Sequence, residues 1–131
     1  MRIPHQALVA LANGEQFVLM RNIGQPFEPR LEREEVLDLE LTNFSAGIRH
    51  QDRTGSTDLD ELAHGAAIAE WLNAKALNGE LDALVIAADP KTLGQIRQRC
   101  HKEVEARIVG EIAKDLINSP IREIEQVLAA T

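Results

Sequence analysis

Three observations predict an α/β fold with a mixed five-stranded sheet and helices on its faces. Apolar runs at residues 7–12 and 81–88 have the length and continuity of strands buried on both faces. Strand patterns dominate the first 41 residues, whereas helical and strand patterns alternate after residue 58. The length of 131 residues suits one domain over residues 1–131, and 44% apolar with 27% charged residues excludes disorder throughout.

Two strands joined by a tight turn are predicted first. Residues 7–12 are almost continuously apolar, and the Asn13-Gly14 pair behind them is the strongest short-range hairpin signal. Residues 16–21 form the second strand. After a loop rich in glycine and proline, acidic and apolar residues alternate within residues 35–41, which predicts an edge strand whose acidic side chains face water.

A long polar connection separates these strands from the first predicted helix. Residues 42–60 show no periodicity, and a connection of this length is usually functional or disordered. Asp58 or Asp60 is suited to cap a helix that runs to about Asn78 and stops at Gly79.

The second half alternates strands and helices. Residues 81–88 form a buried strand, and Asp89-Pro90 ends it and opens a helix. Residues 106–112 form a weaker strand, and Pro120 opens a last amphipathic helix. The order is β-β-β-α-β-α-β-α, an antiparallel meander followed by two right-handed crossovers, as in ribonuclease-H-like and related translation-factor folds.

Charge and cysteine content exclude several protein classes. The net charge of −7 argues against a generic nucleic-acid coat or a basic membrane-surface protein. The single cysteine, Cys100, excludes an internal disulfide framework. Because no signal-peptide pattern and no apolar stretch of membrane-spanning length is present, we expect a cytoplasmic protein with no membrane partner.

Four segments carry a family resemblance, and the most specific is a strand-Pro-x-x-Leu-Gly-x-x-Arg pattern followed by His-Lys-Glu-Val. The segments are residues 8–14, 81–97, 101–107 and 111–116, with Pro120 and Ile124-Glu125 beyond them. In these segments, which span nearly the whole chain, the sequence resembles the bacterial host attachment protein family, also called "protein required for attachment to host cells". That family is distantly similar to the middle domain of archaeo-eukaryotic peptide-chain release factors, which implies a ribosome- or RNA-associated role.

The sequence departs from these relatives at three points. The release-factor Gly-Gly-Gln tripeptide is absent, so the resemblance does not support peptidyl-tRNA hydrolysis by that route. Asn13 stands where the turn of the family usually has Asp, and residues 52–60 form a shorter segment than in the family. A site that depends on either feature would be altered.

A basic segment lies between Lys91 and Arg107, where five basic residues accompany two acidic ones. Its net charge is +3, so the rest of the chain carries −10. The segment begins where the C-terminal end of a strand meets a helix, the usual ligand crevice of open α/β sheets and a position that favours phosphate. We expect Lys91, Thr92 and Arg97 to contact an RNA phosphate or a nucleotide; the alternative is a solvated helix face with i,i+4 ion pairs.

His101-Lys102-Glu103 continues the basic segment. A histidine beside a carboxylate is suited to acid–base work. Residues two apart on a helix point away from each other, however, so His101 and Glu103 are not expected to form a dyad. The pattern favours a helix-end histidine that stabilises the last carbonyls. His101 and Lys102 therefore join the ligand candidates with no role assigned.

No metal or cofactor is expected. A ribonuclease-H-type site needs several carboxylates around two Mg²⁺ ions about 4 Å apart, and residues 7–12 contain no acidic side chain. A scattered polar group matches no zinc or calcium spacing and suits a linker with a helix cap. Its members are His50, Asp52, Asp58, Asp60 and His64.

The leading interpretation is a non-enzymatic module that binds RNA, the ribosome or a translation partner through the basic segment. A second interpretation is a nucleotide- or small-molecule-binding enzyme that uses the same crevice, with Asn13 and Asp89 as polar selectors. A third is a protein-interaction module, or a homodimer, that acts indirectly in host-cell attachment. The sequence leaves the three open.

Overall fold

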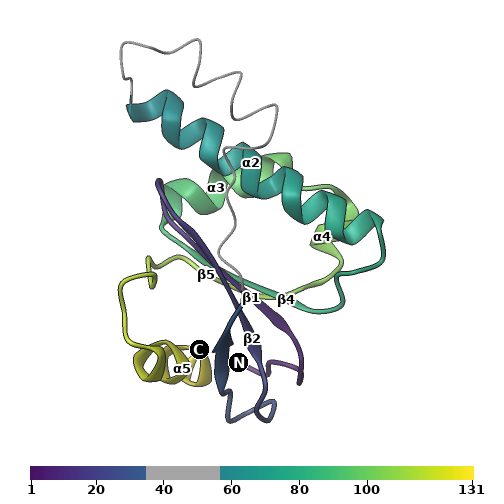
Figure 1. Cartoon of the computed structure of the whole chain (residues 1–131), viewed down its shortest axis with the longest axis vertical. Coiled ribbons are helices and arrows are strands. Elements are labelled where there is room, and N and C mark those ends of the chain that lie inside the picture. Colours follow the sequence, from purple (N-terminus) through teal and green to yellow (C-terminus); the bar gives the residue numbers. More distant parts are fainter. Residues whose placement is uncertain (35–56) are drawn as a thin grey trace.

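The computed structural model describes residues 1–34 and 57–131, without the side chains of residues 57–62. Five strands form one sheet in the order β3-β2-β1-β4-β5 (Figure 1). They are β1 (Leu8–Ala12), β2 (Phe17–Asn22), β3 (Leu31–Arg33), β4 (Leu84–Ala88) and β5 (Ile108–Ile112). β1 pairs antiparallel with β2 and parallel with β4, β2 pairs antiparallel with β3, and β4 pairs parallel with β5. The predicted mixed five-stranded sheet is confirmed.

Helices cover both faces of this sheet. On one face lie α2 (Thr57–Leu77), α3 (Pro90–Arg99) and the short α4 (Lys102–Glu105), and α5 (Ile121–Ala130) packs on the other (Figure 1). Leu8, Ala10 and Ala12 of β1 join the core under α2 and α3. Val9 and Leu11 join the core under α5. Successive side chains of a strand point to opposite faces, so a central strand covered on both sides must be apolar at every position.

The Asn13-Gly14 turn closes the hairpin as predicted. The backbone N–H of Asn13 donates to the carbonyl of Gln16 over 3.1 Å. The side-chain oxygen Oδ1 of Asn13 accepts from the backbone N–H groups of Glu15, at 2.9 Å, and Gln16, at 2.8 Å. An asparagine side chain that bonds its own following backbone is the local reason for a turn here.

The third strand differs from its prediction. β3 covers Leu31–Arg33, in the segment predicted as a loop, and pairs with the end of β2. The predicted edge strand at residues 35–41 lies outside the described residues, as does most of the predicted connection at 42–60. A strand of three residues is too short to show alternation, and its pairing with β2 defines it.

Element boundaries also shift. α2 begins at Thr57, so Asp58 and Asp60 lie within its first turn instead of preceding it. β4 begins three residues and β5 two residues later than predicted. In the described part of the chain, no helix is both long and apolar enough to cross a membrane.

Candidate functional site

The carboxyl ends of β1, β4 and β5 meet at one edge of the sheet because these neighbouring strands run parallel. Ala12 and Ala88 are register partners, so Asn13 and Asp89, which follow them, are neighbours at this edge. The loop after β5 adds Asp115, whose Oδ2 accepts from Nδ2 of Asn13 at 3.2 Å. The structure thus brings Asn13 and Asp89 together at the edge where open α/β sheets bind ligands.

Asp89 caps the N-terminus of α3. Its Oδ2 accepts from the backbone N–H of Thr92 at 3.2 Å, and Pro90 occupies the first helical position. The side chain of Thr92 is only 2% exposed, whereas Lys91 is exposed beside it. The carboxylate of Asp89 already holds the position at the helix N-terminus that a phosphate would take. This end of α3 is therefore less suited to an anion than the sequence suggested, and Thr92 is not accessible to one.

The remaining candidates lie at the other end of α3. A ten-residue helix is about 15 Å long, so Arg97, His101 and Lys102 are separated from Asp89 by most of that length. Arg97 reaches β5, where its Nε donates to Oε2 of Glu111 at 2.6 Å. This hydrogen bond and the charge of Glu111 raise the pKa of Arg97 above its usual value. The seven candidate residues thus form two groups, one at the start of α3 and the other at its end and at the start of α4.

His101 caps α4 and does not end α3. Its Nδ1 accepts from the backbone N–H of Glu103 at 3.2 Å, and its own backbone N–H donates to Oδ1 of Asn73 on α2 at 2.7 Å. The expectation that His101 stabilises the last carbonyls of a helix is therefore wrong: it satisfies a donor at a helix start. The break in the helix after Arg99 produces this difference. His101 and Glu103 form no side-chain dyad, in agreement with the sequence.

A cavity of about 320 Å³ lies between α3, α4 and β5, and we call it the α3–β5 cavity. It is lined by Ile86, Ile96, Arg97, Cys100, Glu105, Ile108 and Glu111. Burial raises the pKa of the Cys100 thiol to about 11, helped by the charges of Glu105 and Glu111. A thiol of this kind is a poor nucleophile near neutral pH. Sequence reasoning missed the cavity because its walls come from four separate elements.

Of the scattered polar group around residues 50–64, the structure describes the side chain of His64 alone. His64 is 4% exposed, and its Nε2 lies 3.0 Å from the carbonyl oxygen of Gln16, a contact between α2 and the hairpin. His50, Asp52 and the side chains of Asp58 and Asp60 lie outside the described residues. Within those residues, no three His, Cys, Asp or Glu side chains are placed to hold a metal ion.

A comparison with known families supports the relation to release factors. The model of a family described as bacterial archaeo-eukaryotic release factor family 12 matches residues 6–128. No curated protein matches the chain. The match concerns the release-factor relation and does not extend to host attachment. Because it covers nearly the whole chain, this protein belongs to the bacterial archaeo-eukaryotic release factor family 12.

Proposed function

We propose that this chain is a non-catalytic translation module that binds ribosomal RNA through the basic segment. The observation that carries the proposal is the placement of its five basic side chains, which are all exposed and belong to the layer of α3 and α4 or to the turn behind it. They are Lys91, Arg97, Arg99, Lys102 and Arg107. Membership in a release-factor-like family supports a role in translation. Any effect on attachment to host cells would then follow indirectly.

Lys102 and Arg107 are the best-placed contacts. Both are exposed, and neither forms an ion pair with a described residue. Arg97 is partly committed to Glu111. Glu103 and Glu105 are also exposed on α4 and reduce the local positive charge. A cation near an RNA phosphate gains affinity by releasing condensed counterions, so binding should weaken as salt rises.

The test is co-sedimentation of the purified protein with bacterial ribosomes, using the double variant Lys102→Glu/Arg107→Glu. We expect at least a tenfold loss of binding at low salt. The slope of log affinity against log salt should also become shallower by about two, one for each lost phosphate contact. Neither substitution removes an ion pair seen among the described residues, so folding should be retained, and circular dichroism checks this.

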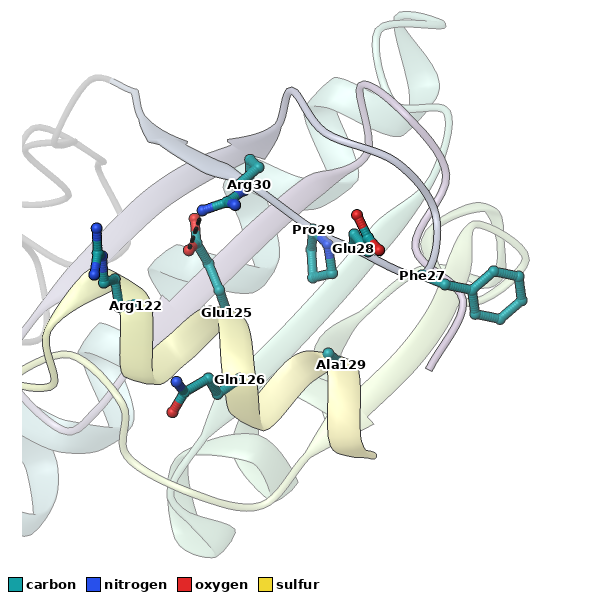
Figure 2. A pocket seen from close by; sticks show the side chains of 8 residues that line it. All are labelled: Phe27, Glu28, Pro29, Arg30, Arg122, Glu125, Gln126 and Ala129. Atoms are coloured by element: carbon teal, nitrogen blue, oxygen red, sulfur yellow. Dashed lines mark ion pairs between the residues drawn. The ribbon is translucent and has the colours of Figure 1, made fainter.

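The matched control is Arg2→Glu/Arg122→Glu. It makes the same charge change at exposed positions on the N-terminal segment and on α5, where Figure 2 shows Arg122; both segments pack on the opposite face of the sheet. The control should bind ribosomes almost as the natural chain does. Equal loss in both variants would mean that net charge, not the basic segment, governs binding. Absence of co-sedimentation by the natural chain would overturn the proposal.

A further inference from the structure

The α3–β5 cavity combines an apolar floor with a polar rim. Ile86 and Ile96 are almost completely buried and close the base of the cavity, whereas Ile108 is half-buried and offers apolar surface to a group that enters. Arg97 and Glu111 also line the cavity and are joined to each other by a hydrogen bond. The two charges of this pair cancel. Such a cavity suits an uncharged, flat group that has polar atoms along one edge.

The Arg97–Glu111 pair has unused hydrogen-bonding capacity. Only Nε of Arg97 and Oε2 of Glu111 take part in their mutual bond. The terminal nitrogens of Arg97 and Oε1 of Glu111 form no hydrogen bond with any described residue. An arginine offers two terminal donor groups, and a carboxylate accepts only. The pair therefore keeps free donors on Arg97 and, next to them, one free acceptor oxygen on Glu111.

Guanine is the nucleobase that matches this order most completely. Along one edge it carries the acceptors N7 and O6 and then the donors N1–H and N2–H₂, which complement an arginine followed by a carboxylate. Cytosine matches in part, with one donor group and two acceptors. Adenine and uracil alternate between donors and acceptors along the corresponding edge and match poorly. We propose that the α3–β5 cavity binds an unstacked guanine base.

The surroundings of the cavity suit a base that belongs to RNA. Lys102 lies two residues after Cys100 in the sequence, and Arg107 directly precedes Ile108, so exposed cations flank two cavity-lining residues. Unpaired bases in single strands are the usual targets of sequence-specific RNA recognition. Glu105 also lines the cavity, and its negative charge would repel a phosphate group placed next to it. If the guanine belongs to RNA, the inference rests on the proposed function. A free guanine nucleotide would use the same base contacts and would not depend on the proposed function.

Cys100 provides a reporter inside the cavity. It is the only cysteine of the chain, it is half-buried, and it lines the cavity wall. The rate at which iodoacetamide alkylates the folded protein at mildly alkaline pH, followed by mass spectrometry, therefore reports on this site alone. We expect millimolar GMP to slow alkylation at least fivefold, CMP to slow it less, and AMP and UMP to have little effect. Equal protection by GMP and AMP, or no protection by GMP, would overturn the inference.

Oligoribonucleotides distinguish the two sources of guanine. A short single strand with one guanine should protect Cys100 at lower concentration than GMP, and this gain should disappear in Lys102→Glu/Arg107→Glu if RNA is the ligand. If GMP protects Cys100 at the same concentration as the oligoribonucleotide or at a lower one, the cavity binds a free nucleotide. If ribosome binding depends on Lys102 and Arg107 but no guanine compound protects Cys100, only the guanine inference fails.

Glu111→Gln tests the edge match directly. The amide keeps the shape of the side chain but replaces one acceptor with a donor, so protection by GMP should fall at least fivefold. The control is Glu103→Gln, an exposed change on α4 at a residue that does not line the cavity. Alkylation of Glu111→Gln without ligand shows whether the cavity stays intact. Undiminished GMP protection in this variant would exclude Glu111 as a recognition group.

Discussion

Asn22→Ala should lower the free energy of unfolding by about 3–4 kcal/mol, because one completely buried side chain joins two segments of backbone. Its Nδ2 donates to the carbonyl of Ile3 at 2.9 Å. Its Oδ1 accepts from the backbone N–H of Gly24, at 2.9 Å, and of Arg30, at 3.0 Å. The amide of Asn22 thus joins the N-terminal segment and the β2–β3 loop to the end of β2, alongside backbone hydrogen bonds between the same segments.

The magnitude follows from the groups that alanine would leave unsatisfied. Three backbone groups lose their partner, and each such group costs about 1–3 kcal/mol when buried. Gly24 is partly exposed and Arg30 is exposed, so water replaces part of the loss and the lower end of the range applies to both. A loss of this size is a large fraction of the roughly 5–15 kcal/mol that stabilises an ordinary domain.

Urea unfolding followed by Trp71 fluorescence measures this change, since Trp71 is the only tryptophan and packs against Phe17. Asn118→Ala, at an exposed position without a described hydrogen bond, is the control and should change stability little. A loss below about 1 kcal/mol for Asn22→Ala would refute the assignment of Asn22 as the joining group.

Asn22→Asp sharpens the test through pH. An ionised carboxylate would set an acceptor against the carbonyl of Ile3, so burial and repulsion should raise the pKa of the new carboxyl above its ordinary value of about 3.9. A raised pKa in the folded state gives stability that is present at low pH and lost as pH rises through that pKa. Relative to the natural chain, the variant should therefore be more stable near pH 4 than at pH 8. An equal deficit at both would contradict the direction of the Asn22 amide.

Three further predictions concern other positions. Cys100 should react with iodoacetamide about a hundredfold more slowly than an ordinary thiol at pH 7, with a rate that rises about tenfold per pH unit until it levels off near pH 11; the urea-unfolded chain is the control. Asp89→Ala should cost about 1 kcal/mol in urea unfolding through loss of the cap on Thr92. Asp89→Ser should lower the free energy of unfolding by less than Asp89→Ala, because serine can still cap the helix. It also removes Oδ1, which is buried without a partner among the described residues. Equal losses of stability in the two variants would contradict the role of Asp89 as a cap. Gly65→Ala should lower the free energy of unfolding by about 1–2 kcal/mol despite a gain in helix propensity, because its new Cβ would lie 3.0 Å from Cβ of Gln95. A more stable variant would show that α3 can move to make room for the methyl group.

Much of the sheet could be predicted because its signals are local or periodic. The turn at Asn13-Gly14 depends on one side chain bonding its own following backbone. The cap at Asp89 depends on a carboxylate that bonds the backbone of Thr92, and the proline that follows Asp89 marks the first helical position. β3 could not be predicted, since three residues carry no periodicity. The candidate site was predicted only in part. Sequence reasoning placed Asn13 and Asp89 at one edge, but it did not show that Arg97 and His101 lie at the far end of α3.

The sequence by itself determined the order of β1, β2, α2, β4, α3, β5 and α5, the polarised charge, and the central position of β1, whose unbroken apolar run requires cover on both faces. Only the tertiary structure decided which polar groups meet. Arg97 bonds Glu111 across 14 positions, and Asn22 bonds Ile3 across 19. Such pairs form when packed elements bring distant residues within about 3 Å, and hydrogen bonding requires that distance whatever the spacing along the chain. The α3–β5 cavity has the same origin, because it exists only where α3, α4 and two strands are packed together.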